Sequence, residues 1–299
     1  MNASVHLLHL ATESVVGIRS EIPSEHASAG ILGTERMGSG VLIAPAGVVL
    51  TAHYLAVGAD RVEIEMTGGE KIPARVAGID YDSGLAALAP LGVRLGGLAR
   101  GRPGPETIGR DAFIVAALEG TRRVASGVVT SRAAFEAFWE YMIDDALTLS
   151  VPSPGLGGGP IVDTHGRVIG VVALSMAEVG RFTLGIPATL ADRLLAGVEA
   201  DGSFENPSPS GWIGLLSYPV GEELVVASAM PGSPADRSGI VEGDRIESIE
   251  GQPTRSRRAL YLGLRATPPG SKLRLGIRRG SESISVEVVT SAIERYFAT

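Results

Sequence analysis

Short runs rich in β-branched residues, separated by glycine-containing turns, fill the chain from about residue 12 to about residue 190. Examples are "SVVGIRS", "GSGVLIAPAGVVLTA", "RVEIEM", "DAFIVAAL" and "ALTLSV". Runs of this length suit strands, and many short strands at such spacing are typical of antiparallel barrels. The 299 residues include 40 glycines, which fits many tight turns better than a helical bundle. We therefore expect a mainly β fold with two small barrels in this region.

The last third of the chain has a different pattern. "PATLADRLLAGVEA" places apolar residues at helical spacing and predicts a helix that closes the first domain. The polar, Pro/Ser-rich "DGSFENPSPS" that follows has no periodicity and is typical of a linker. Beyond it, strand-like and helix-like runs alternate, as in a smaller α+β domain. We predict a first domain over residues 1–200, a linker over 201–210 and a second domain over 211–299.

Composition excludes several classes of function. The absence of cysteine rules out disulfides, a catalytic thiol and thiolate metal sites, and the five histidines are too scattered to suggest a metal site. We expect no cofactor. A net charge of −7 argues against general affinity for nucleic acid, and no run of 18 apolar residues could span a membrane. The N-terminal "MNASVHLLHLATESVVGI" has no basic segment before its mildly apolar stretch, so it is a poor signal peptide and leaves the compartment open.

Several motifs together resemble those of HtrA/DegP-type proteins, in which a trypsin-like protease domain precedes a PDZ domain. In the first domain they are "GSGVLIAPAGVVLTA", "VAGIDYDSGLAAL", "PGLGGGPIVDTHGRVIGV" and "LGIP". In the second they are "GWIGLL", "VVASAMPGSPADRSGIVEGDRIESIEGQP" and "PPGSKLRLGIRRG". The resemblance covers nearly the whole chain. It implies a double β-barrel followed by a PDZ domain, a bacterial role in protein quality control, a periplasmic or other extracytoplasmic location, and trimers formed through the N-terminal segment.

The resemblance also implies a catalytic triad, yet the chain has other residues at the three positions. Alignment on Thr51 and on "GADRVEIEMTGG" puts Tyr54 of "TAHY" where the family has histidine. In "DYDSGLA", Gly84 stands in place of the aspartate, and in "PGLGGGP", Gly157 stands in place of the serine. Losing the serine or the histidine of such a triad costs roughly 10⁶ in rate. We therefore interpret the chain as a pseudoprotease.

Other positions keep both a binding and a structural interpretation. The resemblance makes the N–H of Gly155 an oxyanion-hole-like donor, whereas tight packing alone would also favour a glycine there. It places Val151 in the wall of the former specificity pocket, where we favour an ordinary wall residue over a recognition element.

In the second domain, the resemblance assigns the carboxylate-binding loop of a PDZ groove to Trp212, Ile213, Gly214 and Leu215. The structural alternative for Trp212 is a buried aromatic at a domain edge. The helical run "RSRRALYLGLRA" would border the groove, and we expect its arginines (Arg255, Arg257, Arg258 and Arg265) to form a solvated face, with a preference for acidic peptides as the alternative.

The favoured function is a non-catalytic scaffold or regulator that binds peptides or protein C-termini. One alternative is a working endopeptidase that uses the displaced residues His53, Asp82 and Ser153. Another is that assembly into an oligomer is itself the role of the chain.

Overall fold

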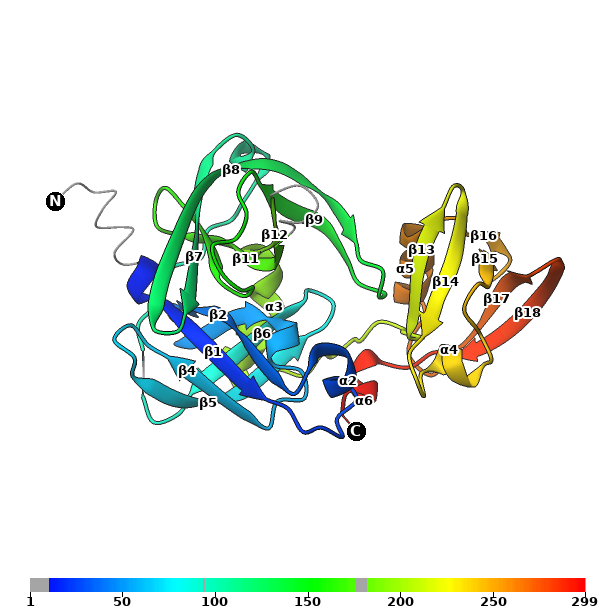
Figure 1. Ribbon diagram of the computed structural model, residues 1–299, viewed down its shortest axis with the longest axis horizontal. Coiled ribbons are helices and arrows are strands. Elements are labelled where there is room, and N and C mark those ends of the chain that lie inside the picture. The colour runs from blue at the N-terminus through cyan, green and yellow to red at the C-terminus, as the bar shows by residue number, and fades with distance from the viewer. Residues whose placement is uncertain (1–10, 94, 176–181, 299) are drawn as a thin grey trace. The chain divides into compact units, whose positions relative to one another are not determined.

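The structure of this chain is a computed structural model that describes residues 11–93, 95–175 and 182–298 (Figure 1). The expectations about an export segment and about trimers rest partly on residues 1–10, which lie outside the described residues. The chain divides into two compact units, residues 1–133 with 144–205 and residues 134–143 with 206–299. The boundary between residues 205 and 206 falls inside the segment predicted as a linker. Residues 134–143, which the sequence places in the first domain, pack with the second unit.

The first unit begins with a closed antiparallel barrel of six strands in the order β1-β2-β3-β6-β5-β4. The strands are β1 (Val15–Glu21), β2 (Glu35–Ile43), β3 (Val48–Ala52), β4 (Arg61–Glu65), β5 (Lys71–Asp80) and β6 (Leu85–Pro90). Strand β4 alternates buried and more exposed residues because only one of its faces meets the core. All five residues of β3 are buried, and four of them are apolar. A short helix, α2 (Ala29–Leu32), lies between β1 and β2.

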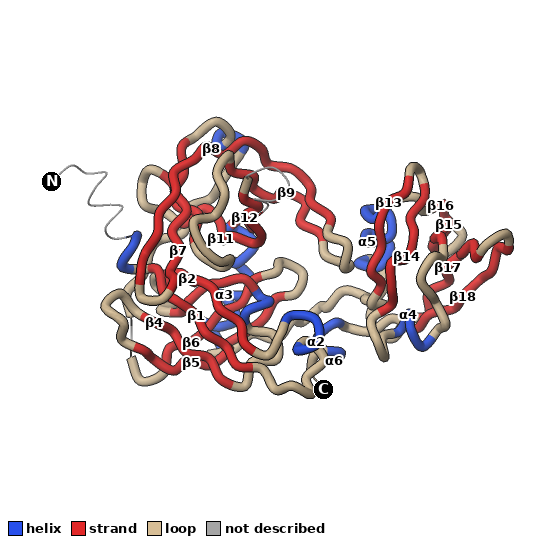
Figure 2. Tube along the Cα trace, viewed as in Figure 1, coloured by secondary structure: helices blue, strands red, loops and turns tan. Residues whose placement is uncertain are grey.

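A second closed barrel completes this unit, with strand order β10-β11-β12-β9-β8-β7. The strands are β7 (Asp111–Leu118), β8 (Thr121–Glu136), β9 (Met142–Leu149), β10 (Pro160–Asp163), β11 (Val168–Ser175) and β12 (Thr183–Pro187). The predicted closing helix, α3 (Asp192–Asp201), follows a 3-10 turn and buries Leu194, Leu195 and Val198. The mainly β fold with two barrels is therefore confirmed, and strands dominate both units in Figure 2.

The second unit contains a six-stranded sheet and three short helices. Its strands are β13 (Leu215–Val220), β14 (Glu223–Ala229), β15 (Arg245–Ile249), β16 (Gln252–Pro253), β17 (Lys272–Arg279) and β18 (Glu282–Val289). Its helices are α4 (Pro234–Arg237), α5 (Arg257–Arg265) and α6 (Ile293–Tyr296). Helix α5 begins at a serine cap, because Ser256 accepts a hydrogen bond from the N–H of Ala259. Its apolar side, with Leu260 and Leu264, belongs to the core that β13, β14, β15 and β17 share.

The two barrels meet at Ser39, a fully buried residue of β2. Its N–H donates to the carbonyl of Gly157 at 2.9 Å, and its hydroxyl accepts from the N–H of Ala117 at 2.9 Å. The Thr51 hydroxyl of β3 donates to the Ser39 carbonyl at 2.7 Å. These bonds fix the loop that contains Gly157 against the first barrel.

No helix within the described ranges is long and apolar enough to cross a membrane. The same residues contain no group of three or more His, Asp or Glu side chains placed to hold a metal ion.

Candidate functional site

A one-turn 3-10 helix, His53–Leu55, follows β3 and carries the first two candidate residues. Buried Arg36 holds this turn, donating from Nη1 to the carbonyls of Tyr54 at 2.6 Å and Val57 at 2.8 Å. Burial lowers the pKa of Arg36 to about 10, so the guanidinium still carries its charge at neutral pH. The turn therefore presents His53 and Tyr54 in fixed positions.

The Tyr54 side chain fills the space beside Gly157. Its ring packs against the core of the first barrel, and a Cβ placed on Gly157 would overlap the Tyr54 hydroxyl oxygen. Burial raises the pKa of Tyr54, so the phenol stays neutral and is a poor base at physiological pH. Two positions that the resemblance assigns to a triad thus lie in contact, without a nucleophile or an imidazole at either.

His53 faces the third position. Gly84 lies in the turn after β5 with φ +78°, and its carbonyl accepts the His53 backbone N–H at 2.9 Å. The same carbonyl lies 3.1 Å from His53 Nδ1, and the ring meets Tyr81 edge to face at 5.9 Å between centroids. Burial lowers the pKa of His53 to about 4, with the charge of Arg36 adding to the effect and the Gly84 carbonyl opposing it. The imidazole is therefore neutral at pH 7.

The residues of the endopeptidase alternative have other neighbours. Asp82 pairs with Arg193 of α3 at 3.3 Å, and the same guanidinium pairs with buried Asp80 at 2.6 Å. The Ser153 hydroxyl is buried, and no atom within the described ranges forms a hydrogen bond with it. A nucleophile needs a base within hydrogen-bond reach, so Ser153 is not activated in this arrangement.

The structure places Val151 and Gly155 in close packing. Val151 packs against the core of the second barrel, and its carbonyl accepts from the Thr183 hydroxyl at 2.8 Å. A Cβ on Gly155 would lie 2.7 Å from the Cβ of Ala116, which is too close for an unstrained contact. Packing alone thus accounts for a glycine at 155, and the oxyanion-hole and pocket-wall roles stay predictions.

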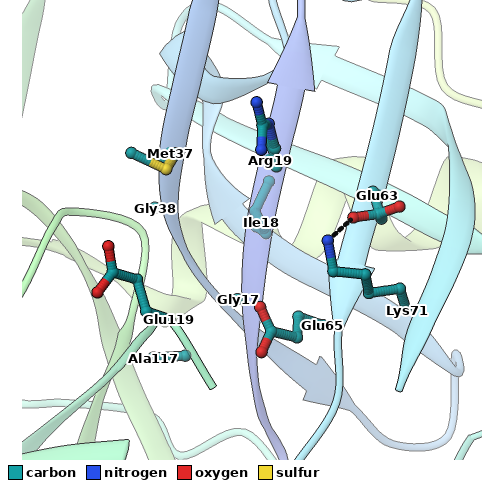
Figure 3. Close-up of a pocket in the computed structure, with 10 residues that line it drawn as sticks. All are labelled: Gly17, Ile18, Arg19, Met37, Gly38, Glu63, Glu65, Lys71, Ala117 and Glu119. Atoms are coloured by element: carbon teal, nitrogen blue, oxygen red, sulfur yellow. Dashed lines mark ion pairs between the residues drawn. The ribbon is translucent and has the colours of Figure 1, made fainter. Parts of the chain in front are cut away.

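A pocket of about 260 Å³ beside the Gly157 loop escaped the sequence analysis (Figure 3). Gly38 lines it, and the next residue along β2 is the Ser39 that bonds to Gly157. Its charged lining is mixed, and Figure 3 shows Lys71 directed toward Glu63, to which it is ion-paired at 2.9 Å. These side chains come from strands far apart in the sequence, so no local motif predicts the pocket.

The loop assigned to carboxylate binding holds a carboxylate. The N–H of Ile213 donates to Glu140 Oε2 at 3.0 Å, and the N–H of Leu215 donates to Glu140 Oε1. Gly214 between them has φ +83°, and a Cβ there would overlap Ser233. Trp212 is buried and pairs through its backbone with Ser291. Sequence reasoning missed Glu140, since nothing near it in the chain indicates this partner.

Burial raises the pKa of Glu140 to about 7, and the N–H groups of Ile213, Leu215 and Gly214 oppose this effect. Charge on Glu140 in turn helps to raise the pKa of neighbouring Tyr261 of α5, after the larger effect of burial. The environment of Glu140 therefore disfavours its charged form.

We expect Gly157→Ala to lower the free energy of unfolding by about 1–3 kcal/mol, because the new Cβ would overlap the Tyr54 hydroxyl. In a Tyr54→Phe background, which removes only that oxygen, the cost is expected to fall by about 1 kcal/mol. Denaturant unfolding of the four proteins measures the coupling. Equal costs in both backgrounds would show that Tyr54 does not occupy this space.

The contact of Glu140 with the loop is expected to weaken as pH rises. Its pKa is about 7 when buried and 4.5 when free, so the buried state binds more protons between these values and loses stability from about pH 4.5 to about pH 7. NMR shifts of the Ile213 and Leu215 amides should titrate with a midpoint near 7 in the wild type. They should not do so in Glu140→Gln. A midpoint below 5, or the same titration in the variant, would contradict this assignment.

Comparison with known proteins agrees with the fold of both units. Residues 38–171 match the model for the trypsin-like peptidase domain, and residues 225–279 match the PDZ domain. The chain is 26% identical over 272 residues to a probable periplasmic serine endoprotease DegP-like of Chlamydia trachomatis, covering 86% of this chain and 54% of the relative. It is 25% identical over 282 residues to a putative serine protease HhoA of Synechocystis, covering 86% of this chain and 71% of the relative. The chain spans about half the length of the DegP-like relatives.

Solved structures extend the likeness over both units. The HtrA-type protease AlgW with a decapeptide has a TM-score of 0.59 at 20% identity, covering 97% of this chain and 98% of the other. The serine endoprotease from Yersinia pestis has a TM-score of 0.58 at 21% identity, covering 97% of each chain. This chain therefore combines a trypsin-like peptidase domain with a C-terminal PDZ domain, as HtrA/DegP-type serine proteases do.

Proposed function

We propose that this chain is a catalytically inactive, HtrA-like pseudoprotease that binds peptides or protein C-termini as a scaffold or regulator. The observation that carries the proposal is the contact between Tyr54 and Gly157. The resemblance implies an imidazole at position 54 and a hydroxyl nucleophile at position 157. Here a neutral phenol lies against a residue with no side chain.

The neighbouring groups do not supply the missing chemistry. Acyl transfer needs a nucleophile, a base that takes its proton, and a third group that orients the base. His53 has the imidazole, but its Nδ1 lies against the Gly84 carbonyl and burial disfavours its protonated form. The protonated imidazole is the species that must form when a serine attacks, so this environment opposes the step.

The binding half of the proposal rests on the PDZ domain. Backbone N–H groups of its loop already bind a carboxylate, that of Glu140. A peptide that adds as a strand beside such a loop gains main-chain hydrogen bonds, and its terminal carboxylate binds the same N–H groups. The similar AlgW structure is described as containing a decapeptide. Peptide binding without hydrolysis is therefore the function that the geometry supports best.

A working endopeptidase remains the second candidate, because one relative is named a probable serine endoprotease and another a putative serine protease. It would use His53, Asp82 and Ser153. The Ser153 hydroxyl would first have to acquire a base, since within the described ranges it forms no hydrogen bond.

Purified wild-type chain is expected to leave an unfolded protein substrate, such as reduced and carboxymethylated lactalbumin, uncleaved over many hours. Mass spectrometry of the substrate would detect even rare cuts. His53→Ala and Ser153→Ala serve as test variants, and Ser24→Ala, which changes an exposed serine, serves as the control. Cleavage that persists in Ser24→Ala and disappears in either test variant would overturn the pseudoprotease proposal in favour of the second candidate.

The full chain is expected to bind peptides that end in an apolar residue, with a dissociation constant in roughly the micromolar range. A free-acid peptide should bind at least about tenfold more tightly than its amide, since the amide cannot offer a carboxylate to the N–H groups of the loop. Fluorescence anisotropy with the two peptides measures the ratio. Equal binding of acid and amide would argue against carboxylate capture.

A further inference from the structure

The tip of the β8–β9 hairpin, residues 136–142, belongs to the same compact unit as the PDZ domain. Glu140 at this tip gives its carboxylate to the N–H groups of Ile213 and Leu215, the place expected for a peptide's terminal carboxylate. These amides are thus already satisfied by a residue of the chain itself.

The tip also pairs with the edge of the sheet. Strand β13 is the first in the order β13-β14-β15-β17-β18, so one of its edges is open for an added strand. Trp139 forms an antiparallel bridge with Leu216, and the N–H of Ser217 donates to the Phe138 carbonyl at 2.9 Å. The tip therefore uses the backbone groups through which a peptide would add to β13.

An apolar side chain follows the carboxylate. Met142 is only 1% exposed and belongs to the core cluster that includes Ile213, Leu215 and Leu264. Burying a methionine side chain of this kind is strongly favourable, as it is for an apolar residue of a bound peptide. The tip therefore supplies the three elements of peptide recognition by such a groove: a carboxylate, a strand and an apolar anchor.

Helix α5 holds the tip from the other side. The Tyr261 hydroxyl donates to the Ala137 carbonyl at 2.7 Å and accepts the N–H of Glu140 at 3.1 Å. The tip lies between β13 and α5, both of which bond to it.

The arginines of the α5 region differ from the solvated face that the sequence predicts. Arg257 donates to the Glu136 carbonyl at 3.0 Å, and Arg265 donates to the Met142 carbonyl at 2.5 Å. Arg258 pairs with the Glu136 carboxylate at 3.5 Å. Arg255 pairs instead with exposed Glu222. Three of the four arginines thus bond to the tip.

The backbone of the tip points to a requirement for this carboxylate. The N–H of Ala137 donates to the Tyr141 carbonyl, which closes a hairpin loop over residues 138–140. The last loop residue, Glu140, has φ +33°, in the left-handed region. Glycine is the usual residue at the left-handed position of such loops, because it adopts that conformation at least cost. A glutamate there costs conformational free energy in the turn. The hydrogen bonds that its carboxylate accepts from Ile213 and Leu215 offset this cost.

We propose that residues 136–142 are an internal ligand of the PDZ groove, which an external peptide or protein C-terminus must displace in order to bind. Displacement by an external peptide or protein C-terminus rests on the proposed function. Occupancy of the groove by the tip does not. A segment tethered in this way acts at an effective concentration of about millimolar. With an intrinsic dissociation constant of about 10 μM for the groove, a tip at this effective concentration weakens the apparent binding of an external peptide by about a hundredfold.

Two variants of the full chain test this proposal. Glu140→Gly removes the carboxylate while giving the left-handed position its preferred residue, so a tip that is only a good turn would be strengthened. The second variant replaces residues 137–141 with Gly-Ser-Gly-Ser-Gly. Glu222→Ala is the matched control, because it removes one acidic side chain from the same unit at an exposed position.

The first readout is hydrogen exchange of the Ile213 and Leu215 amides at constant pH. We expect their exchange to rise by about tenfold or more in both test variants and to stay unchanged in Glu222→Ala. The second readout is anisotropy of a labelled free-acid peptide ending in methionine, the residue type that occupies the apolar site. The affinity of this peptide for the loop-replacement variant should be about tenfold or more higher than its affinity for the wild type.

The outcomes separate the inference from the proposed function. Faster amide exchange with no peptide binding by any protein would uphold the internal ligand and refute peptide capture. Unchanged exchange and affinity in both variants would overturn the internal ligand. Weaker peptide binding in the loop-replacement variant would also overturn it, because the tip would then be part of the peptide site rather than its occupant.

Discussion

The close approach of the Gly157–Gly159 backbone to Ser39 is the constraint on which the double barrel depends. The Ser39 N–H bonds to the Gly157 carbonyl, and a Cβ on Gly158 would overlap the Ser39 carbonyl and the Thr51 hydroxyl. Gly159 has no more room, since a Cβ there would overlap the carbonyl of Val115. The glycines therefore join β2 and β3 of one barrel to β7 of the other. This packing requires glycine whether or not the loop takes part in chemistry.

On the proposed function, the same constraint explains how a protease framework can exist without a nucleophile. The backbone bonds of the Gly157 loop involve no side chain, so they hold the loop in place with a glycine at 157. The space beside Gly157 is filled by Tyr54, whose position is fixed by Arg36 beneath its turn. Framework and chemistry are separable here because different groups carry them, as is general for folds that host many functions.

Local sequence patterns were enough to predict the fold but only part of the sites. Strand runs and glycine turns report on neighbours in the chain, so they could be predicted directly. The peptide-binding role of the Trp212–Leu215 loop came from the family resemblance and stays a prediction. Glu140 could not, because its partners Ile213 and Leu215 lie 73 and 75 residues further along the chain. Arg257 and Arg265 were expected to face solvent for the same reason. Their carbonyl acceptors lie more than a hundred residues away in the chain, so the local sequence gives no sign of them. The pocket beside Gly38 likewise assembles from several strands.

The central claim, that the site has no activated nucleophile, is tested most directly by covalent labelling. The full chain would be incubated with an excess of a peptidyl diphenyl phosphonate carrying an apolar residue next to phosphorus, and its intact mass would be measured over time. Such reagents react with a serine only when a neighbouring base activates it. The account predicts an unchanged mass after prolonged incubation. Addition of one phosphonyl group per chain, absent from Ser153→Ala, would contradict it and identify Ser153 as a working nucleophile.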